Sequence, residues 1–386
     1  MLMIEYSPIF SGHGIYLEKL IPKLLGNGCS IDIIAGDFNR LPPESVIHGV
    51  KIHRIKYSPG EKNWEIKLSF RVIRFLVKNR NYFDVLHLHG HLDIYGLLTL
   101  ACKFLGKKII MQMVLMGTDD PLSLNKCYKL MNLRWSILKQ IDHFIHISEP
   151  IGKSCRAVGI RDNKMMCIRQ GVDTDLFAPV TREEKVCLRR ERNLPEGQLI
   201  VTFVGAIIHR KGIDILLDAW EKIQETNRDI LLLLVGPYKF EHDENRNNSE
   251  LDDYVRGIFQ QIENNHLNVR FVGFAKDIPQ YLKLSDIFVL PSRKEGFGNV
   301  IIEAMACGIP PVVAHMDGVS TETVTDGVTG YVFRNTTELG ERLKVLIGDS
   351  TMREAIGRSA RADVEGRFKL DDIAREYVSV YRGVMT

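Results

Sequence analysis

Two glutamates stand eight positions apart in the segment EGFGNVIIEAMACG, residues 295–308. Glycines after Glu295 allow a tight loop, and the following apolar run predicts a helix from about Asn299 to the last glycine. Asparagine can cap a helix, and the N–H groups of a first helical turn attract anions. Glu303 would lie inside this helix, within reach of a ligand across its start. A carboxylate accepts sugar hydroxyls but is a poor partner for phosphate, so the pattern suits a nucleotide, with diphosphate at the helix start and ribose on Glu303. The alternative is two surface glutamates.

A second segment, VGAIIHRKGIDILLDAW (204–220), places Arg210 and Lys211 between a strand that ends at Gly205 and a helix. Arginine can clamp phosphate oxygens in a fork, and lysine adds a point charge. The alternative is a solvated helix start. Two cations at a helix N-terminus oppose its dipole, however, and a bound anion would remove that objection.

A third candidate is the glycine loop SGHG (11–14), which precedes a helical pattern near the start of the chain. Glycine lets a phosphate approach the backbone, and the helix start offers N–H groups to it. The loop lacks the full G-x-G-x-x-G pattern. Taken alone it is weak evidence, because a turn from strand to helix often needs glycine for geometry only.

Short apolar runs alternate with amphipathic helical patterns along the 386 residues, which predicts parallel sheets covered on both faces. There are two series of such runs, so we expect an α/β protein of two doubly wound, Rossmann-like domains. The boundary is predicted in the turn-rich segment 171–185, with domains at 1–175 and 176–367. The predicted strands are MLMIEYSPIF at the start, then 31–36, 50–55, 83–89, 108–115, 142–148, 165–170, 199–205, 230–236, 269–274, 286–292 and 310–315.

Composition narrows the class of protein. An apolar share of 45% supports large cores. The sequence contains no run of eighteen apolar residues, so we expect no helix that spans a membrane. The start lacks the features of a signal peptide, and the seven scattered cysteines fit reduced thiols, so we expect a cytoplasmic protein. Residues 1–175 hold 24 basic and 16 acidic residues, a net charge of +8, and the remainder a net of −5. The basic half suggests an anionic partner there, although solvated charge without a partner is the simpler interpretation.

One predicted helix in the basic half combines charge with aromatic bulk. In residues 62–80 the basic side chains of Lys67, Arg71, Arg74 and Lys78 fall on one helical stripe beside apolar residues. Such stripes can lie in the headgroup layer of an anionic membrane, which would make the protein peripheral on its cytoplasmic face. The alternative is a solvated helix face.

These motifs resemble those of the retaining nucleotide-sugar glycosyltransferases of the GT-B fold, glycosyltransferase family 4, also called glycosyl transferases group 1. The signature is EGFGNVIIEAMACGIPPVV, with two glutamates eight apart. The resemblance spans nearly the whole chain and is most specific in the second half. Further matching segments are DIFVLPS, the R-K-G at 210–212, QGVDTDLFAP, the V-G-F at 272–274 and DGVTGYVF.

The resemblance implies roles for individual residues. Glu303 is similar to the ribose-binding acid, and Glu295 to the acid that faces the donor sugar. Arg210 and Lys211 resemble the diphosphate clamp and, with Glu295, the catalytic groups; Gly14 would approach the diphosphate from the other domain. The other implied donor contacts are Gly273, Phe274, Gly296, Phe297, Gly298, Asn299 and Val300. In this fold the two domains face a cleft, and the terminal helix, at 368–386, returns to the first domain.

The chain departs from the family pattern at two positions. Many relatives have arginine where Ala206 stands, so Arg210 would carry more of the clamp. Many also have a histidine near the reacting sugar where Met116 stands, and a thioether cannot move a proton. Asp119 and His89 are candidates for that acceptor contact, and both can equally be structural.

We expect no metal and no cofactor. The D-x-D at 173–175 falls in a turn that the family keeps for packing at the hinge. The run HLHGH (87–91) has no cysteine or third ligand near it, so buried or acceptor-facing histidines are the better interpretation.

The predicted function is transfer of a sugar from a UDP- or GDP-sugar to a hydroxyl acceptor that can be lipid-linked, in polysaccharide, lipopolysaccharide or glycolipid synthesis. No nucleic-acid partner is predicted. Two alternatives remain: a sugar-nucleotide epimerase of the same fold, and a catalytically impaired partner subunit that binds the nucleotide sugar.

Overall fold

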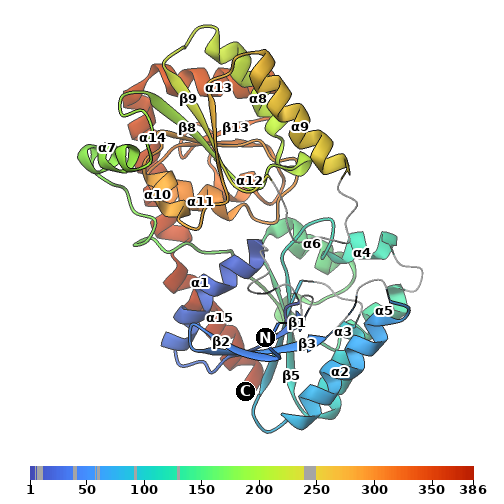
Figure 1. Cartoon of the computed structure of the whole chain (residues 1–386). Coiled ribbons are helices and arrows are strands. Elements are labelled where there is room, and N and C mark those ends of the chain that lie inside the picture. The colour runs from blue at the N-terminus through green and yellow to red at the C-terminus, as the bar shows by residue number, and fades with distance from the viewer. Residues whose placement is uncertain are drawn as a thin grey trace. The chain divides into compact units, whose positions relative to one another are not determined.

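The computed structural model describes residues 1–4, 6, 12–37, 41–56, 58, 61–90, 94–127, 131–238 and 249–386, without the side chains of 125–127, 131–134 and 249. The chain folds as two compact units (Figure 1). The first comprises Met1–Gly171 and Leu370–Thr386, and the second Val172–Lys369. The boundary lies at Gly171, the first residue of the predicted hinge segment, rather than at residue 175.

The strands of the first unit form a three-stranded part in the order β1-β3-β2 and a four-stranded part in the order β4-β5-β6-β7. All pairs are parallel except β2 with β3. The sequence predicted each of these strands except β2, whose residues alternate between exposed and partly buried. Their bounds are β1 Asp32–Asp37, β2 Glu44–Ile47, β3 Val50–Lys56, β4 Val85–His89, β5 Lys108–Met113, β6 His143–His146 and β7 Met165–Cys167.

The segment Met1–Ile4 joins these two parts. Leu2 forms parallel bridges with both Ile34 of β1 and Leu88 of β4. Its N–H donates to His87 O at 2.8 Å, and its carbonyl accepts from His89 N at 3.1 Å. The chain start therefore has the strand-like pairing that its apolar sequence predicted, although it is too short to count as a named strand.

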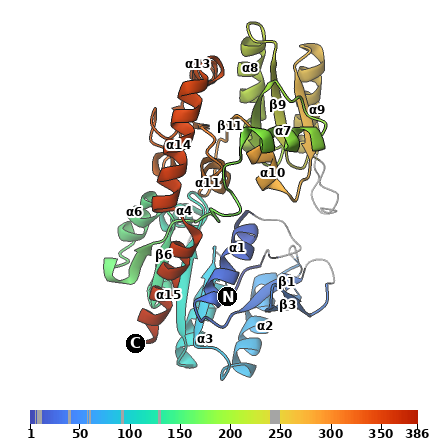
Figure 2. The same ribbon diagram turned by 90° about the vertical axis from the view of Figure 1, so that its left-hand side faces the viewer.

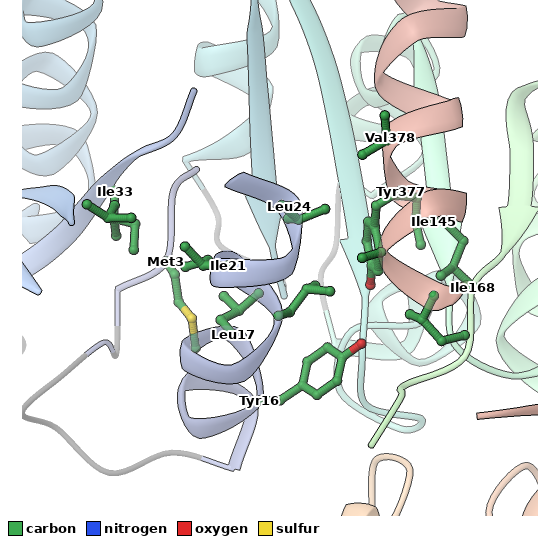
Figure 3. Close-up of a cluster of buried hydrophobic side chains, with 14 of the residues drawn as sticks. Met3, Tyr16, Leu17, Ile21, Leu24, Ile33, Ile145, Ile168, Tyr377 and Val378 are labelled. Atoms are coloured by element: carbon green, nitrogen blue, oxygen red, sulfur yellow. The ribbon is translucent and has the colours of Figure 1, made fainter. Parts of the chain in front are cut away.

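Helices α1 and α15 supply the main core of the first unit (Figure 3). Leu17, Ile21 and Leu24 of α1 are buried with Tyr377 and Val378 of α15 against the sheet. The C-terminal helix is thus an integral part of the unit that begins the chain. The helices of this unit are α1 Gly12–Gly26, α2 Trp64–Lys78, α3 Tyr95–Phe104, α4 Pro121–Cys127, α5 Met131–Leu138, α6 Glu149–Ala157 and α15 Leu370–Met385.

The second unit contains one parallel sheet of six strands in the order β10-β9-β8-β11-β12-β13. The order reverses direction between β8 and β11, and ligands of such sheets bind beyond the strand ends at that point. Every residue of β9 is buried, as expected for a central strand of a sheet covered on both faces. The strands are β8 Leu199–Val204, β9 Ile230–Val235, β10 Val269–Gly273, β11 Ile287–Leu290, β12 Pro311–Ala314 and β13 Tyr331–Phe333.

Helices cover this sheet in two groups (Figures 1 and 2). Helix α8 packs against both α9 and α13, whereas α11 packs against α10 and α14. The chain just after α11 approaches α14 closely: a Cβ placed on Gly357 would lie only 2.1 Å from the carbonyl oxygen of Gly308. The helices are α7 Arg182–Glu191, α8 Ile213–Gln224, α9 Ser249–Asn264, α10 Ile278–Lys283, α11 Asn299–Ala306, α12 Ser320–Thr323, α13 Thr336–Gly348 and α14 Ser350–Arg367.

The contact between Gly357 and Gly308 allows a test with a matched control on the same helix. Gly357→Ala is expected to lower the free energy of unfolding by about 1–3 kcal/mol, because the methyl group meets a backbone carbonyl. Gly366→Ala, whose Cβ would meet nothing within 4 Å, is expected to raise it by about 0.5–1 kcal/mol. Chemical denaturation of both variants measures the difference. Equal effects of the two substitutions would contradict this packing.

Candidate active site

Three glycines end neighbouring strands at one edge of the second unit's sheet. Gly205 N donates to Val235 O at 2.8 Å, and Gly236 N donates to Gly273 O at 2.9 Å. A Cβ on Gly236 would lie only 1.9 Å from Gly205 O. The backbones that follow β8 and β9 therefore approach too closely for side chains. At this edge of the sheet, backbone rather than side chains lies beside the site.

The clamp residues Arg210 and Lys211 belong to a short 3-10 helix, His209–Lys211, between β8 and α8. It ends at Gly212, whose φ of 69° and whose contact with Pro291 exclude a side chain: a Cβ would lie 2.1 Å from Pro291 O. The segment 209–211 is thereby held against the chain that follows β11.

Arg293 fixes the same two segments to each other. Its N–H donates to Arg210 O at 2.8 Å, and its guanidinium donates to His209 O at 2.7 Å. The guanidinium also forms an ion pair with Asp214, at 2.5 Å, whose carboxylate accepts from Tyr254 Oη at 2.8 Å. The sequence motifs did not single out these three side chains. Their pairing joins positions 40 and 79 residues apart, which no local pattern reveals.

Glu295 accepts from both predicted clamp residues. Lys211 Nζ lies 2.5 Å from Oε1 and Arg210 Nη1 lies 3.3 Å from Oε2, while Ser292 Oγ donates to Oε1 at 2.6 Å. The Glu295 side chain is only 9% exposed. The structure therefore brings the predicted sugar-binding acid and the predicted diphosphate clamp together in one ion-paired cluster.

Helix α11 begins directly after this cluster, but its cap differs from the prediction. The N-cap is Gly298, with φ 78°, and no side chain caps the helix. The capping role predicted for Asn299 is wrong, because this residue is already the first helical residue. Its Oδ1 is buried without a hydrogen-bond partner in the part of the chain that the structure describes. An amide oxygen in this position is suited to accept from a bound hydroxyl or N–H group.

Glu303 lies on the second turn of α11 and is half-buried. One turn further on, burial raises the pKa of the Cys307 thiol to about 12, with the carboxylate of Glu303 adding to the effect. Cys307 is therefore a neutral thiol rather than a nucleophile. Glu303 remains the carboxylate that this helix offers near its start.

The remaining predicted donor contacts divide by exposure. The Phe297 side chain is buried against Phe368, with ring centroids 5.9 Å apart, so only its backbone can touch a ligand. Phe274 is half exposed, whereas Gly296 and Val300 are partly buried. Gly273 adopts a φ of 79°, which favours glycine.

The residues predicted in the first unit are mostly buried. Gly14 lies in the first turn of α1 and is buried, while Ser11 of the same loop is outside the described residues. Asp119 Oδ2 accepts from the N–H groups of Val114 and Leu115 at 3.1 and 3.0 Å. That contact gives Asp119 a local structural role, and its predicted acceptor contact stays a prediction.

His89 belongs to a buried cluster of polar side chains. His87 and His89 project from β4 on the same face, with ring centroids 4.0 Å apart. His13 Nε2 of α1 lies 3.0 Å from His89 Nδ1, and His87 Nδ1 lies 2.9 Å from Tyr381 Oη. Within the described residues four buried atoms here have no hydrogen-bond partner: His13 Nδ1, His87 Nε2, His89 Nε2 and Gln112 Oε1. An acceptor contact for His89 remains a prediction.

Burial keeps these histidines neutral. It lowers the pKa of His87 and of His89 well below 6.5, and repulsion from neighbouring basic groups acts in the same direction. The unfolded chain therefore binds more protons than the folded chain once the pH falls below about 6.5. By linkage, each such histidine should remove stability on acidification, by about 1.4 kcal/mol per pH unit once its unfolded form is protonated.

We expect His87→Leu to flatten the fall of unfolding free energy between pH 6.5 and 4.5 relative to the unsubstituted protein. Denaturant titrations of both proteins at several pH values measure the slope. His48→Asn, at an exposed turn in the same unit, is the control. An unchanged slope in His87→Leu would contradict the neutral, buried state of this side chain.

Two segments, the D-x-D at 173–175 and HLHGH at 87–91, resembled metal sites in the sequence. The first closes a turn, and the second lies partly outside the described residues. Asp173 Oδ1 accepts from the N–H groups of Asp175 and Leu176 at 3.1 and 3.0 Å, which closes the turn. In HLHGH, His91 lies outside the described residues. Among the residues that are described, no group of three or more His, Cys, Asp or Glu side chains is arranged to hold a metal ion. That catalysis needs no metal stays a prediction.

Two family models match the chain. The one described as Glycosyltransferase Family 4 matches residues 10–176, and the one described as Glycosyl transferases group 1 matches residues 186–363. Similar proteins include an uncharacterized glycosyltransferase of Methanocaldococcus jannaschii, 25% identical, which aligns over 100% of this chain and 98% of its own. N-acetyl-alpha-D-glucosaminyl L-malate synthase of Bacillus anthracis is also 25% identical, over 98% of this chain and 95% of its own.

Solved structures share the fold. HepE of Anabaena, in complex with UDP and glucose, superposes with a TM-score of 0.77 at 21% identity over 99% of both chains. Sucrose-phosphate synthase of Thermosynechococcus elongatus gives a TM-score of 0.77 at 22% identity, over 99% of this chain and 95% of its own. These likenesses confirm the predicted fold class, two α/β domains with parallel sheets of the GT-B type. The two family models show that the chain is a glycosyltransferase, and it belongs to glycosyltransferase family 4, the group 1 glycosyl transferases.

Proposed function

We propose that the protein transfers a sugar from a UDP- or GDP-sugar to a hydroxyl acceptor, with retention at the anomeric carbon. The main observation behind the proposal is the ion-paired cluster of Arg210, Lys211 and Glu295, which directly precedes α11. Glu303 lies one turn inside this helix. Cations and helix N–H groups suit a diphosphate, and carboxylates suit the hydroxyls of two sugars. The complexes of HepE with UDP and UDP-glucose support a nucleotide-sugar donor.

In this proposal the departing diphosphate is met by fixed donors. Arg210, Lys211 and the N–H groups at the start of α11 stabilise the charge that develops as the bond to the sugar breaks. The acceptor is bound by the first unit and can be lipid-linked, as polysaccharide or glycolipid synthesis requires.

Two experiments test the proposal. A thermal-shift screen over nucleotide sugars should identify the donor, because a ligand at a hundred times its dissociation constant stabilises the fold by about 2.7 kcal/mol. Product analysis with that donor then separates the alternatives: a new α- or β-glycoside matching the donor, an epimerised donor, or binding without turnover. Only the glycoside with retained configuration agrees with the proposal.

We also propose that the first unit docks on an anionic membrane surface at the cytoplasmic face. Lys67, Arg71, Arg74 and Lys78 of α2 are all exposed, although Lys67 pairs with Glu61 and Arg71 donates to Lys56 O. Apolar side chains are also exposed on α2 and on α3, which packs against α2. These are Ile66, Phe70, Val77, Leu97, Leu100 and Phe104, the last 92% exposed. No helix among the described residues is apolar enough over sufficient length to cross a bilayer.

We expect the protein to sediment with vesicles that contain phosphatidylglycerol at low salt, and less at high salt, since exposed charges are screened. Phe70→Ser combined with Phe104→Ser should weaken binding, because both aromatic side chains are withdrawn from the headgroup layer. Val328→Ser, which removes an exposed apolar side chain of the second unit, is the control. Absence of sedimentation at low salt would end the proposal.

A further inference from the structure

The Glu295 carboxylate holds the charges that a diphosphate needs. It accepts from Lys211, Arg210 and Ser292 together, at 2.5, 3.3 and 2.6 Å. The Lys211 side chain is 13% exposed and Glu295 9%, so solvent screens this pair little. Charge-assisted hydrogen bonds of this kind are stronger than neutral ones.

A diphosphate bound by the clamp therefore competes with Glu295 for these two cations. The exchange is easier at Arg210, which is 45% exposed and also donates to Lys294 O at 2.7 Å. At Lys211 it leaves a buried carboxylate with Ser292 as its remaining donor among the three contacts. A buried carboxylate that loses its partners is strongly destabilised unless new donors replace them.

Glu295 cannot avoid this exchange by moving away with its loop. Arg293 fixes the segment before it to the segment 209–211 through Arg210 O and His209 O, and its ion pair with Asp214 reinforces the link. The carboxylate and the two cations therefore stay within reach of one another, and only side-chain rotation can separate them.

We propose that Glu295 is an internal competitor of the diphosphate, and that it makes the site prefer a nucleotide sugar over the free nucleoside diphosphate. The inference rests on the proposed function. A nucleotide sugar brings phosphates for Arg210 and Lys211 together with sugar hydroxyls that donate to the released carboxylate. A nucleoside diphosphate without sugar brings only the phosphates and leaves Glu295 short of donors. The same residue thus favours release of the product once the sugar has left.

The test compares the affinities of two pairs of probes, UDP with UDP-glucose and GDP with GDP-mannose, by calorimetry. In Glu295→Gln the competing charge is removed at nearly the same shape. We expect the affinity for the nucleoside diphosphate of the recognised pair to rise about tenfold, and the affinity for its nucleotide sugar not to rise. Ser292→Ala keeps the charge but removes the donor that remains to Glu295, so it should shift the ratio in the opposite direction, further toward the nucleotide sugar. Glu354→Ala, at an exposed position of α14, is the control and should leave the ratio of the two affinities unchanged.

Glu295→Asp is a second variant in case the amide disturbs folding, because it draws the carboxylate back from Lys211 and should shift the ratio in the same direction. Unchanged affinity for the nucleoside diphosphate in both Glu295 variants, or an equal change for both probes of a pair, would overturn the inference while leaving the proposed function intact. If the unsubstituted protein binds none of the four probes and no other nucleotide sugar, the proposed function fails, and the inference fails with it.

Discussion

Lys211→Ala is expected to lower the rate of sugar transfer by about 10²–10³-fold, and a chelator such as EDTA to leave the rate of the unsubstituted enzyme nearly unchanged. A departing nucleoside diphosphate develops negative charge that must be met by fixed cations or by a metal. Lys211 and Arg210 are held together beside the start of α11, where they can meet this charge directly. A divalent cation next to two fixed cations would be repelled.

Lys222→Ala is the matched control for this prediction, because Lys222 is an exposed lysine on α8, the helix that follows the clamp. It should transfer sugar at the rate of the unsubstituted enzyme. Arg210→Ala should lower the rate in the same direction as Lys211→Ala. Activity that disappears with EDTA and returns with magnesium or manganese would show that the charges of the site have been assigned wrongly.

Glu303→Ala is expected to weaken nucleotide-sugar binding by at least about tenfold, while the free energy of unfolding changes little. Two ribose hydroxyls lose a shared charged acceptor, and hydrogen bonds to charged groups contribute about 1.5–3 kcal/mol each. Alanine has the highest helix propensity, so α11 should persist. Calorimetric titration with the recognised nucleotide sugar measures the affinity, and denaturation measures the stability.

The exposed Glu354 of α14 provides the comparison for this substitution, as Glu354→Ala removes a carboxylate from a helix of the same unit. It should bind the nucleotide sugar as the unsubstituted protein does. Equal affinities of Glu303→Ala and Glu354→Ala would remove Glu303 from the ribose site.

The sequence predicted every named strand except β2 and β13. ILLLLVG became β9, every residue of which is buried, because only a central strand can cover such a run on both faces. β2, with the sequence ESVI, is an antiparallel edge strand with alternating exposure, and β13 has only three residues. β2 has only two apolar residues, and β13 is apolar throughout but too short to stand out from a loop.

The part of the site whose residues lie close together in the sequence was predictable. Glu295, Gly298 and Glu303 come from one segment of strand end, loop and helix, and the structure keeps them there. The ion pairs of Glu295 with Arg210 and Lys211 join positions 85 and 84 residues apart, so only the folded sheet brings them together. The cap at α11 was mistaken because the positive φ of Gly298 places the helix start one residue earlier than an asparagine cap requires.

The contribution of α15 to the first unit has a consequence for biosynthesis. Leu370, Ile373, Tyr377 and Val378 belong to the same core as Leu17, Leu20 and Leu24 of α1. Hydroxyl groups of Tyr16 and Tyr377 point toward each other across it, and Gly171 N donates to Tyr16 Oη at 3.3 Å (Figure 3). Domains usually fold in the order in which the ribosome makes them. Here the first unit cannot complete its core when its first 171 residues leave the ribosome. The segment that completes this core is translated only after the whole of Val172–Lys369. During that interval the nascent chain exposes the surface of α1, β4 and β5 that α15 later covers, which is where a chaperone would be needed.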